Sequence, residues 1–505
     1  MFNNKRNKIR YFCVSTLLCI EVPLMAQIHV TLEDAIDKYV FNTSKVKTEK
    51  LRYNNIKLEY SNFRKSHLPA FGITLTPISF NRNMTLLQNY MTGEYSNVVE
   101  YSNTSHGSLY ITQKVMPTGG TFRVSSSLSY LRQFSNNINS FSSVPLYMSY
   151  SQSLFGGGKI DKFQYSLYNL RNKVAYKNFC TSVSTEQQTI LNLYITSYCN
   201  MLDVGFYSQK VQISRELVDV ATKKREMGRI TEYDFNQIKL QMLEDEMKLQ
   251  NSQHAYKTSL RNLAMELCLE EIQIDSLNID YLPKTIDENI VCGYIQKNNP
   301  DIQNLELRRI NADYERYTAR LGTRFNADVS LSFGLNQYAS KLSGAYKTPD
   351  KQQSVGITLS IPVFQWGINK NKRKIAENEY EEIIIDIEDA KKRFQSQIKE
   401  YIFDYNNSLR LLNIAKLKYN LALQQYEFAS VKYKTGKISS IDLTTANKDC
   451  LSAKQEYIST ITSLYVNYYH IRHISLHDYV SNMDLMDLFD EKSKDNGNIY
   501  RYNKE

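Results

Sequence analysis

The sequence predicts a mainly helical, internally duplicated protein that also carries membrane-type β-strands. Glycine (18) and proline (9) are scarce among the 505 residues, so long uninterrupted helices are expected. Two segments keep the spacing of a helical apolar stripe. Runs that alternate apolar and polar residues precede both segments, and such runs are typical of strands with two different faces.

The duplication is clearest at two glycine corners. "KREMGRITEYDF" (224–235) and "KYKTGKISSIDL" (432–443) share Lys, Gly, Ile and Asp at an offset of 208. "SLFGGGKI" (153–160) aligns with "PVFQWGIN" (362–369) at an offset of 209, and "SHLPAFGITL" (66–75) with "GTRFNADVSL" (322–331) at 256. The first copy therefore has 47 extra residues between the start and the end of its strands. Each half reads as a helix, strands and two long helices that meet at a glycine.

The long helices follow from the spacing of apolar residues. One stripe is Phe163, Leu167, Leu170 and Val174; the other is Phe394, Ile398, Ile402, Tyr405, Leu409 and Leu412. Both are typical of a coiled-coil-like seam. The segments run from Gly158 to Gly228 and from Gly367 to Gly436, so an unbroken helix over either is roughly 100 Å long.

The strands alternate over about ten residues, as membrane barrel strands and soluble sandwich strands both do. Three runs show this alternation, and the residues that recur at every second position are, run by run, Val329, Leu331, Phe333, Leu335; Val355, Ile357, Leu359, Ile361, Val363; and Leu146, Met148, Tyr150, Gln152, Leu154. The extra residues lie around 107–131 and contain the turn signal "PTGG". They form either two more wall strands, giving six, or an elaborated outer region on four strands. We expect four.

The two ends of the chain differ from the rest. Residues 1–26 have a basic start, a short apolar core and a small residue before Gln27, which predicts an export signal peptide cleaved after Ala26. Without them the net charge falls from +10 to +7, and no nucleic-acid module is present. Five cysteines remain with no C-x-x-C pair, so no disulfide framework is expected. The polar tail 476–505 is expected to be poorly ordered.

No residue set supports catalysis, a metal or a cofactor. "FGGGK" lacks the spacing of a phosphate loop and is interpreted as a flexible strand-to-helix joint. His470, His473 and His477 have the spacing of one helix face, but no acidic or cysteine ligand accompanies them, so we predict no metal site. Because no such residue set is present, the protein is not predicted to be an enzyme.

The mean hydropathy of −0.46 excludes a bundle of membrane helices.

At this point the chain resembles the TolC-type outer-membrane efflux family, over roughly residues 30–475. The resemblance rests on "TLEDAIDKYV", on "ENIVCGYIQKNNPDIQNLEL" and on the tip-like "YKTGKISSIDLTTANKDCLSA" (433–453). It implies a homotrimer with an α-barrel in the periplasm under a β-barrel in outer-membrane lipid. It also implies two partners, a periplasmic adaptor and an inner-membrane pump. The protein would then be a passive duct of a tripartite efflux or type I secretion system for small molecules or polypeptides.

The resemblance also assigns residues at the tips. Tyr433 and Asp234 match a gate latch and Asp442 an acidic ring, but Ile438 replaces the expected arginine and Thr445 a second carboxylate. The adaptor would bind Met227, Gly228 and Arg229 on one tip and Thr435, Gly436 and Lys437 on the other. As an alternative to the gate roles, Asp234 and Asp442 are first-turn acids that stabilise a helix dipole.

These observations divide the chain into a signal peptide (1–26), a first repeat (27–266), a linker (267–286), a second repeat (287–475) and the tail (476–505). An alternative function remains open: an exported coiled-coil or adhesin-like protein without a pore. The sequence does not identify the cargo.

Overall fold

The computed structural model describes residues 28–88, 91–134, 137–277 and 282–495. The predicted signal peptide therefore lies outside the described residues. The chain forms two compact units, which are described separately. The smaller contains Met1–Ile36 and Leu193–Leu277, and the larger contains Asp37–Asn192 and Asn278–Glu505.

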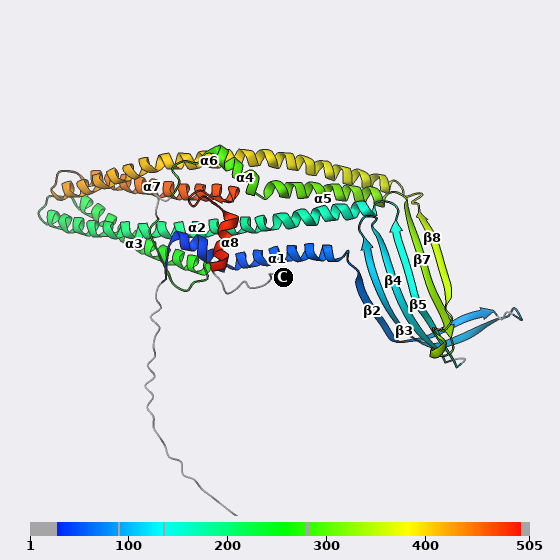
Figure 1. Ribbon diagram of the computed structural model, residues 1–505. Helices are drawn as coiled ribbons and strands as arrows, with labels where there is room; N and C mark the ends of the chain where they lie inside the picture. Colours follow the sequence, from blue (N-terminus) through cyan, green and yellow to red (C-terminus); the bar gives the residue numbers. More distant parts are fainter. Residues whose placement is uncertain (1–27, 89–90, 135–136, 278–281, 496–505) are drawn as a thin grey trace, which may run out of the picture. The chain divides into compact units, whose positions relative to one another are not determined.

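The larger unit contains one six-stranded antiparallel sheet (Figure 1). Its order follows the chain: β2 (Ala70–Gln88), β3 (Tyr95–Val115), β4 (Gly120–Gln133), β5 (Ile138–Ser153), β7 (Asn326–Ala339) and β8 (Asp350–Ser360). The expectation of four strands is wrong. The extra residues form the β3–β4 hairpin, which pairs with β2 on one side and β5 on the other and is thus part of the sheet.

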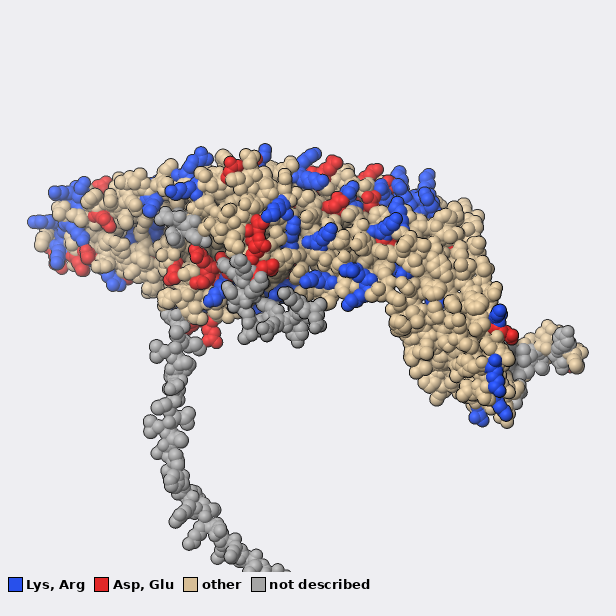
Figure 2. Space-filling view, in the orientation of Figure 1, with Lys and Arg blue, Asp and Glu red and all other residues tan. Residues whose placement is uncertain are grey.

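The strand register separates apolar from polar side chains. Leu109 pairs with Ile73 and Ile111 with Val124, so these large residues share one face, which we call the apolar face. The register carries this face on through Met148 and Phe333. The polar face carries mostly serine and threonine. Figure 2 shows that the visible side of the sheet has few charged residues, which gather near its far end.

Long helices extend from the sheet. They are α1 (Ser44–Lys65), α2 (Gly157–Glu226), α5 (Asp301–Gly322) and α6 (Ile368–Lys434), the last of which pairs with α7 (Ser440–Ser475). The predicted stripe is confirmed in α6, where Ile398, Ile402, Tyr405 and Leu412 are buried. Among the described residues, no helix combines the length and the apolar composition that a bilayer-spanning helix needs.

The described part of the tail, residues 476–495, is more ordered than its composition predicts. Its residues form β9 (His477–Asp478), β10 (Met483–Asp484) and α8 (Leu485–Asp495), and Lys297 of α4 (Glu288–Asn298) pairs with Asp484 at 2.7 Å. Leu485, Leu488 and Phe489 are buried, and the Phe489 ring packs edge-on against Phe41. Three apolar residues at helical spacing anchor an otherwise polar segment.

The smaller unit contains the second half of α2, the helix α3 (Glu232–Glu266) and a short parallel pair of strands, β1 (Ile28–Val30) and β6 (Ile272–Ile274). The Tyr194 hydroxyl lies 3.1 Å from the Val30 carbonyl oxygen and accepts a hydrogen bond from the Asp275 N–H. The pair of strands is thereby fixed to α2.

Candidate functional site

The two glycine corners have the same backbone hydrogen bonds. At the first corner, the Gly228 N–H donates to Arg225 at 2.9 Å and the Arg229 N–H to Lys224 at 2.8 Å. At the second, Gly436 donates to Tyr433 at 3.0 Å and Lys437 to Lys432 at 2.9 Å. This is the Schellman pattern of a helix C-terminus, formed twice at an offset of 208 residues.

Glycine is required at both corners because the chain there enters the left-handed region. The backbone φ is +69° at Gly228 and +75° at Gly436. A side chain at this angle is strained, whereas glycine adopts it freely. Around Gly228 no atom lies within 4 Å of an added Cβ, so the backbone of this tip is open to a partner.

Both returning helices begin with a hydroxyl side chain as the N-cap. Thr231 accepts a hydrogen bond from the Asp234 N–H at 3.1 Å, and Ser439 accepts one from the Asp442 N–H at 3.2 Å. The Asp442 carboxylate in turn accepts from the side chain and backbone of Ser439, and these bonds lower its pKa. Ser439 and Asp442 form a complete capping box, and Asp234 lies in the first turn of α3, where its charge is favourable to the helix dipole.

The gate roles remain predictions. Tyr433 is buried near the end of α6, and Asp234 belongs to the other compact unit. Asp442 is exposed in the first turn of α7, and the Thr445 hydroxyl donates to the Ile441 carbonyl.

The predicted docking residues are solvent-exposed. Met227 has 65% of its surface accessible, and Gly228 and Arg229 beside it are also exposed. Thr435, Gly436 and Lys437 are exposed at the second corner. Each tip therefore offers an open glycine and a basic side chain to a partner.

Sequence reasoning missed a buried ion pair in the α2–α3 hairpin. Lys210 and Asp245 are 3% and 0% exposed, and Nζ lies 3.3 Å from Oδ1. Ser214 donates to the other carboxylate oxygen at 2.6 Å, and Gln241 donates to Oδ1 at 3.1 Å. The available signal was a lysine and an aspartate among the residues that the two helices bury.

A second missed feature is a packed joint where β5 meets α2. A Cβ on Gly119 would lie 2.4 Å from the Gly157 carbonyl carbon, and one on Gly158 would lie 2.3 Å from the Pro117 oxygen. Lys114 pairs with the buried Asp161 at 2.5 Å beside this contact. "FGGGK" is therefore a tight brace for the β3–β4 turn, and the expectation of a flexible joint is wrong.

A third missed feature is a buried polar cluster at the end of α7. Arg472, 2% exposed, lies 3.2 Å from Asp37 and donates to Gln187 at 2.9 Å. Burial opposes its charge, but the nearby carboxylates of Asp37 and Asp478 raise its pKa. The cluster connects α2, α7 and the N-terminal segment of the larger unit, which is a structural role.

The three histidines do not share a helix face. His470 stacks on Tyr401, and His473 is largely buried, which lowers its pKa to about 4, with a smaller effect of nearby His470. His477 lies beyond the end of α7, where its Nδ1 is 2.9 Å from Asp484. Within the described residues no group of three His, Cys, Asp or Glu side chains is arranged to hold a metal.

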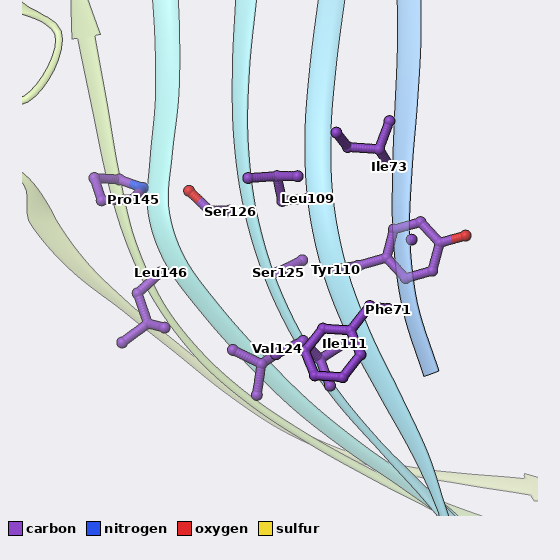
Figure 3. A pocket seen from close by; sticks show the side chains of 11 residues that line it. Phe71, Ile73, Leu109, Tyr110, Ile111, Val124, Ser125, Ser126, Pro145 and Leu146 are labelled. Carbon is purple, nitrogen blue, oxygen red and sulfur yellow. The ribbon is translucent and has the colours of Figure 1, made fainter. Parts of the chain in front are cut away.

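A groove of about 520 Å³ crosses the apolar face of β2–β5 (Figure 3). Its walls include Phe71, Ile73, Leu109, Ile111 and Val124, and Tyr110, Ser125 and Ser126 are among the other residues that line it. The groove has neither an acid, a base nor a nucleophile paired with one. It is suited to apolar contact, not to chemistry.

The comparisons agree with this architecture. The family model described as "Outer membrane efflux protein" matches residues 293–473. The Campylobacter jejuni CmeC outer membrane channel has 15% identity and a TM-score of 0.64, over 92% of this chain and 89% of that chain. The outer membrane protein VceC from Vibrio cholerae has 13% identity and a TM-score of 0.60, over 88% and 95%.

A membrane protein from Pseudomonas aeruginosa also matches, with 13% identity and a TM-score of 0.62, over 88% of this chain and 90% of that chain. No curated protein matches the sequence. At these identities the solved structures show a shared fold. Together with the family match, they confirm the resemblance that the glycine corners predicted.

Proposed function

We proceed from the premise that this chain belongs to the outer membrane efflux protein family, and propose that three copies form the outer-membrane duct of a tripartite efflux or type I secretion system. As a family member it is a channel of the cell outer membrane that extends into the periplasm, and it is not an enzyme. The observation that carries the proposal is the pair of glycine corners, which share one hydrogen-bond pattern and join long helices, in a chain that also has a two-faced sheet.

The sheet supports a membrane barrel. Its apolar face is exposed, with Phe71 at 79% and Val355 at 76%, which is costly in water but favourable in lipid. Aromatic residues lie at both ends of the strands: Trp366 and Phe364 near the helices, Tyr338 and Phe134 at the far end. Aromatic girdles at two levels are typical of the two membrane–water interfaces.

Two features support self-association. Within the described residues, β2 and β8 are the outer strands of the sheet, and each has one unpaired edge that a neighbouring copy would pair. In addition, α6 carries a second stripe of exposed apolar residues at heptad-like spacing: Leu411, Ile414, Leu417, Leu421, Phe428 and Val431. A ring of helices requires such a second seam because each helix then has two neighbours.

The tips are the proposed adaptor-docking surface. Replacing Gly228 and Gly436 together with tryptophan should abolish export while leaving the amount of trimer in the outer membrane unchanged. Alanine at both positions is the matched control, because it imposes the same backbone strain with little bulk. If the tryptophan variant exports normally, the tips are not the docking surface.

The gate is proposed to rest chiefly on Tyr433 and Asp234. Ile438 and Thr445 cannot supply the charge or the second carboxylate that the family pattern has at those positions. One hydrogen bond to a charged group contributes about 1.5–3 kcal/mol, so three symmetric copies hold the tip closed only modestly. Asp442, one per chain, would form a ring of three carboxylates that attracts cations.

The decisive experiment is detergent extraction followed by reconstitution in planar bilayers. A duct predicts heat-resistant trimers that conduct ions. An exported coiled-coil or adhesin-like protein without a pore predicts no conductance at any protein concentration, and that result would reject the proposal.

A further inference from the structure

The two halves of the chain show that a hairpin has been inserted into the wall of the sheet. The sequence repeat aligns the start of β2 with that of β7, and the end of β5 with that of β8. β7 and β8 pair directly. Their counterparts β2 and β5 are separated by β3 and β4, which pair with them along the strands with one register shift in the β2–β3 ladder and one in the β4–β5 ladder. The insertion therefore widens the wall by two strands.

The inserted strands are well fitted to the wall. The Tyr110 ring of β3 covers Gly72 of β2, where a Cβ would lie 2.3 Å from the ring. At its turn the hairpin is fixed by the glycine contact with Gly157 and by the Lys114–Asp161 pair. These contacts make the hairpin a permanent part of the sheet.

The width of a closed barrel follows from strand number. Strands about 4.8 Å apart and tilted by about 40° give a backbone diameter of roughly 24 Å for twelve strands and roughly 36 Å for eighteen. Three chains of six strands supply eighteen. In the proposed trimer, α2, α3, α6 and α7 of three chains would supply twelve helices, and a ring of twelve helices about 9–10 Å apart is also roughly 36 Å across.

The polar face leaves this width open. Its side chains are mostly small hydroxyls, such as Ser125, Ser127 and Ser149. The larger Tyr110 and Tyr147 lie over cross-strand glycines, so their rings follow the wall. With about 5 Å for side chains on each side, roughly 25 Å remains free, against roughly 14 Å with twelve strands.

We propose that this duct has an eighteen-stranded barrel as wide as its helical tunnel and that it exports hydrophilic polypeptides. A helix with side chains is about 10–12 Å across, so roughly 25 Å admits two packed helices, whereas roughly 14 Å admits one extended or helical chain. Where its side chains are described, the serine-rich wall is lined mostly by small hydroxyls, which bind small lipophilic compounds poorly. This inference rests on the proposed trimeric duct and selects among its cargoes.

Cysteine labelling on intact cells tests the width independently of the gate. Ser127→Cys places a thiol on the polar face of β4, and Leu128→Cys is the matched control on the apolar face. Maleimide–polyethylene glycols of increasing size are added outside the cells, and labelling of the unsubstituted chain gives the background. We expect Ser127→Cys to react with polymers up to roughly 20 Å in diameter and Leu128→Cys to react with none.

The other possible results separate a narrow barrel from the absence of a duct. A size limit below roughly 15 Å, or equal labelling of the two variants, overturns the wide barrel while leaving the duct intact. Absence of trimers rejects the proposed function itself. A second measurement uses Ser127→Trp, which should lower conductance in planar bilayers, whereas Leu128→Trp should not. Equal conductance of these two variants also contradicts the inference.

Discussion

The buried pair of Lys210 and Asp245 permits a sharp test of how the first hairpin is held together. Asp245→Ala leaves the Lys210 ammonium buried at 3% exposure without its carboxylate. Removing one partner of a buried pair costs about 3–5 kcal/mol, because the remaining charge loses the carboxylate that compensates its desolvation. Ser214 and Gln241 also lose their acceptor. We therefore expect a large local destabilisation of the α2–α3 hairpin.

Hydrogen–deuterium exchange in the assembled protein measures this local stability. A loss of about 3–5 kcal/mol accelerates exchange of α2–α3 amides by two to almost four orders of magnitude, since 1.36 kcal/mol is tenfold. The double variant Lys210→Met with Asp245→Asn removes both charges and nearly keeps the volume of both side chains. It should exchange close to the wild-type rate, because no charge is left buried without a partner and the amide oxygen still accepts the hydrogen bonds of Ser214 and Gln241.

The second hairpin supplies the internal control. Lys418 occupies the position equivalent to Lys210 but pairs on the surface with Glu456, both being about half exposed. Exposed pairs contribute about 0–1 kcal/mol, so Lys418→Met should leave exchange in α6–α7 almost unchanged. If Asp245→Ala changes exchange by no more than about threefold, the pair does not stabilise the hairpin as argued.

Three further predictions concern other parts of the molecule. Tyr433→Phe alone should raise single-channel conductance, and Asp442→Asn should weaken cation preference and inhibition by trivalent cations without altering assembly. Unchanged conductance in the first variant together with unchanged ion selectivity in the second would reject the proposed gate. Burial holds the pKa of His473 near 4 in the folded protein, against about 6.5 in the unfolded chain. The contribution of this residue to the free energy of unfolding is therefore complete above pH 6.5 and is lost as the pH falls towards 4. About 2 kcal/mol should disappear between pH 7 and 5, seen as a drop in the thermal midpoint that His473→Leu removes. Gly119→Ala should destabilise the protein by about 1–3 kcal/mol more than Gly93→Ala. Gly93 is the matched control because its backbone φ is nearly the same but no atom lies within 4 Å of an added Cβ. Equal thermal midpoints of the two variants would contradict the packed brace.

The elements with strong local signals were predictable. The glycine corners need a left-handed residue and a cap within a few positions, and a chain that encodes this twice shows it by self-comparison. Helix α6 was visible because its apolar residues recur at 3- and 4-residue steps. Both signals arise from neighbours along the chain, so no knowledge of tertiary contacts was needed.

The wall of the sheet was not predictable because strand pairing is non-local. Alternating residues in 107–131 look the same whether the hairpin lies inside the wall or outside it. Only the pairing of β3 with β2 and of β4 with β5 decides between the two. The tail was misjudged for a similar reason: Leu485, Leu488 and Phe489 are few, but tertiary burial makes them sufficient.

The two repeats differ where their helices pack, and this difference follows from what each position must do. The corners retained Gly228 and Gly436 because only glycine adopts the required backbone angle without strain. The seams faced no such demand, since many combinations of side chains fill the same space. One seam therefore carries Asp245 where the other carries Ala453, although both positions are buried. A buried charge that must find its lysine tolerates fewer registers than an alanine does, so the first hairpin should hold its alignment more strictly than the second.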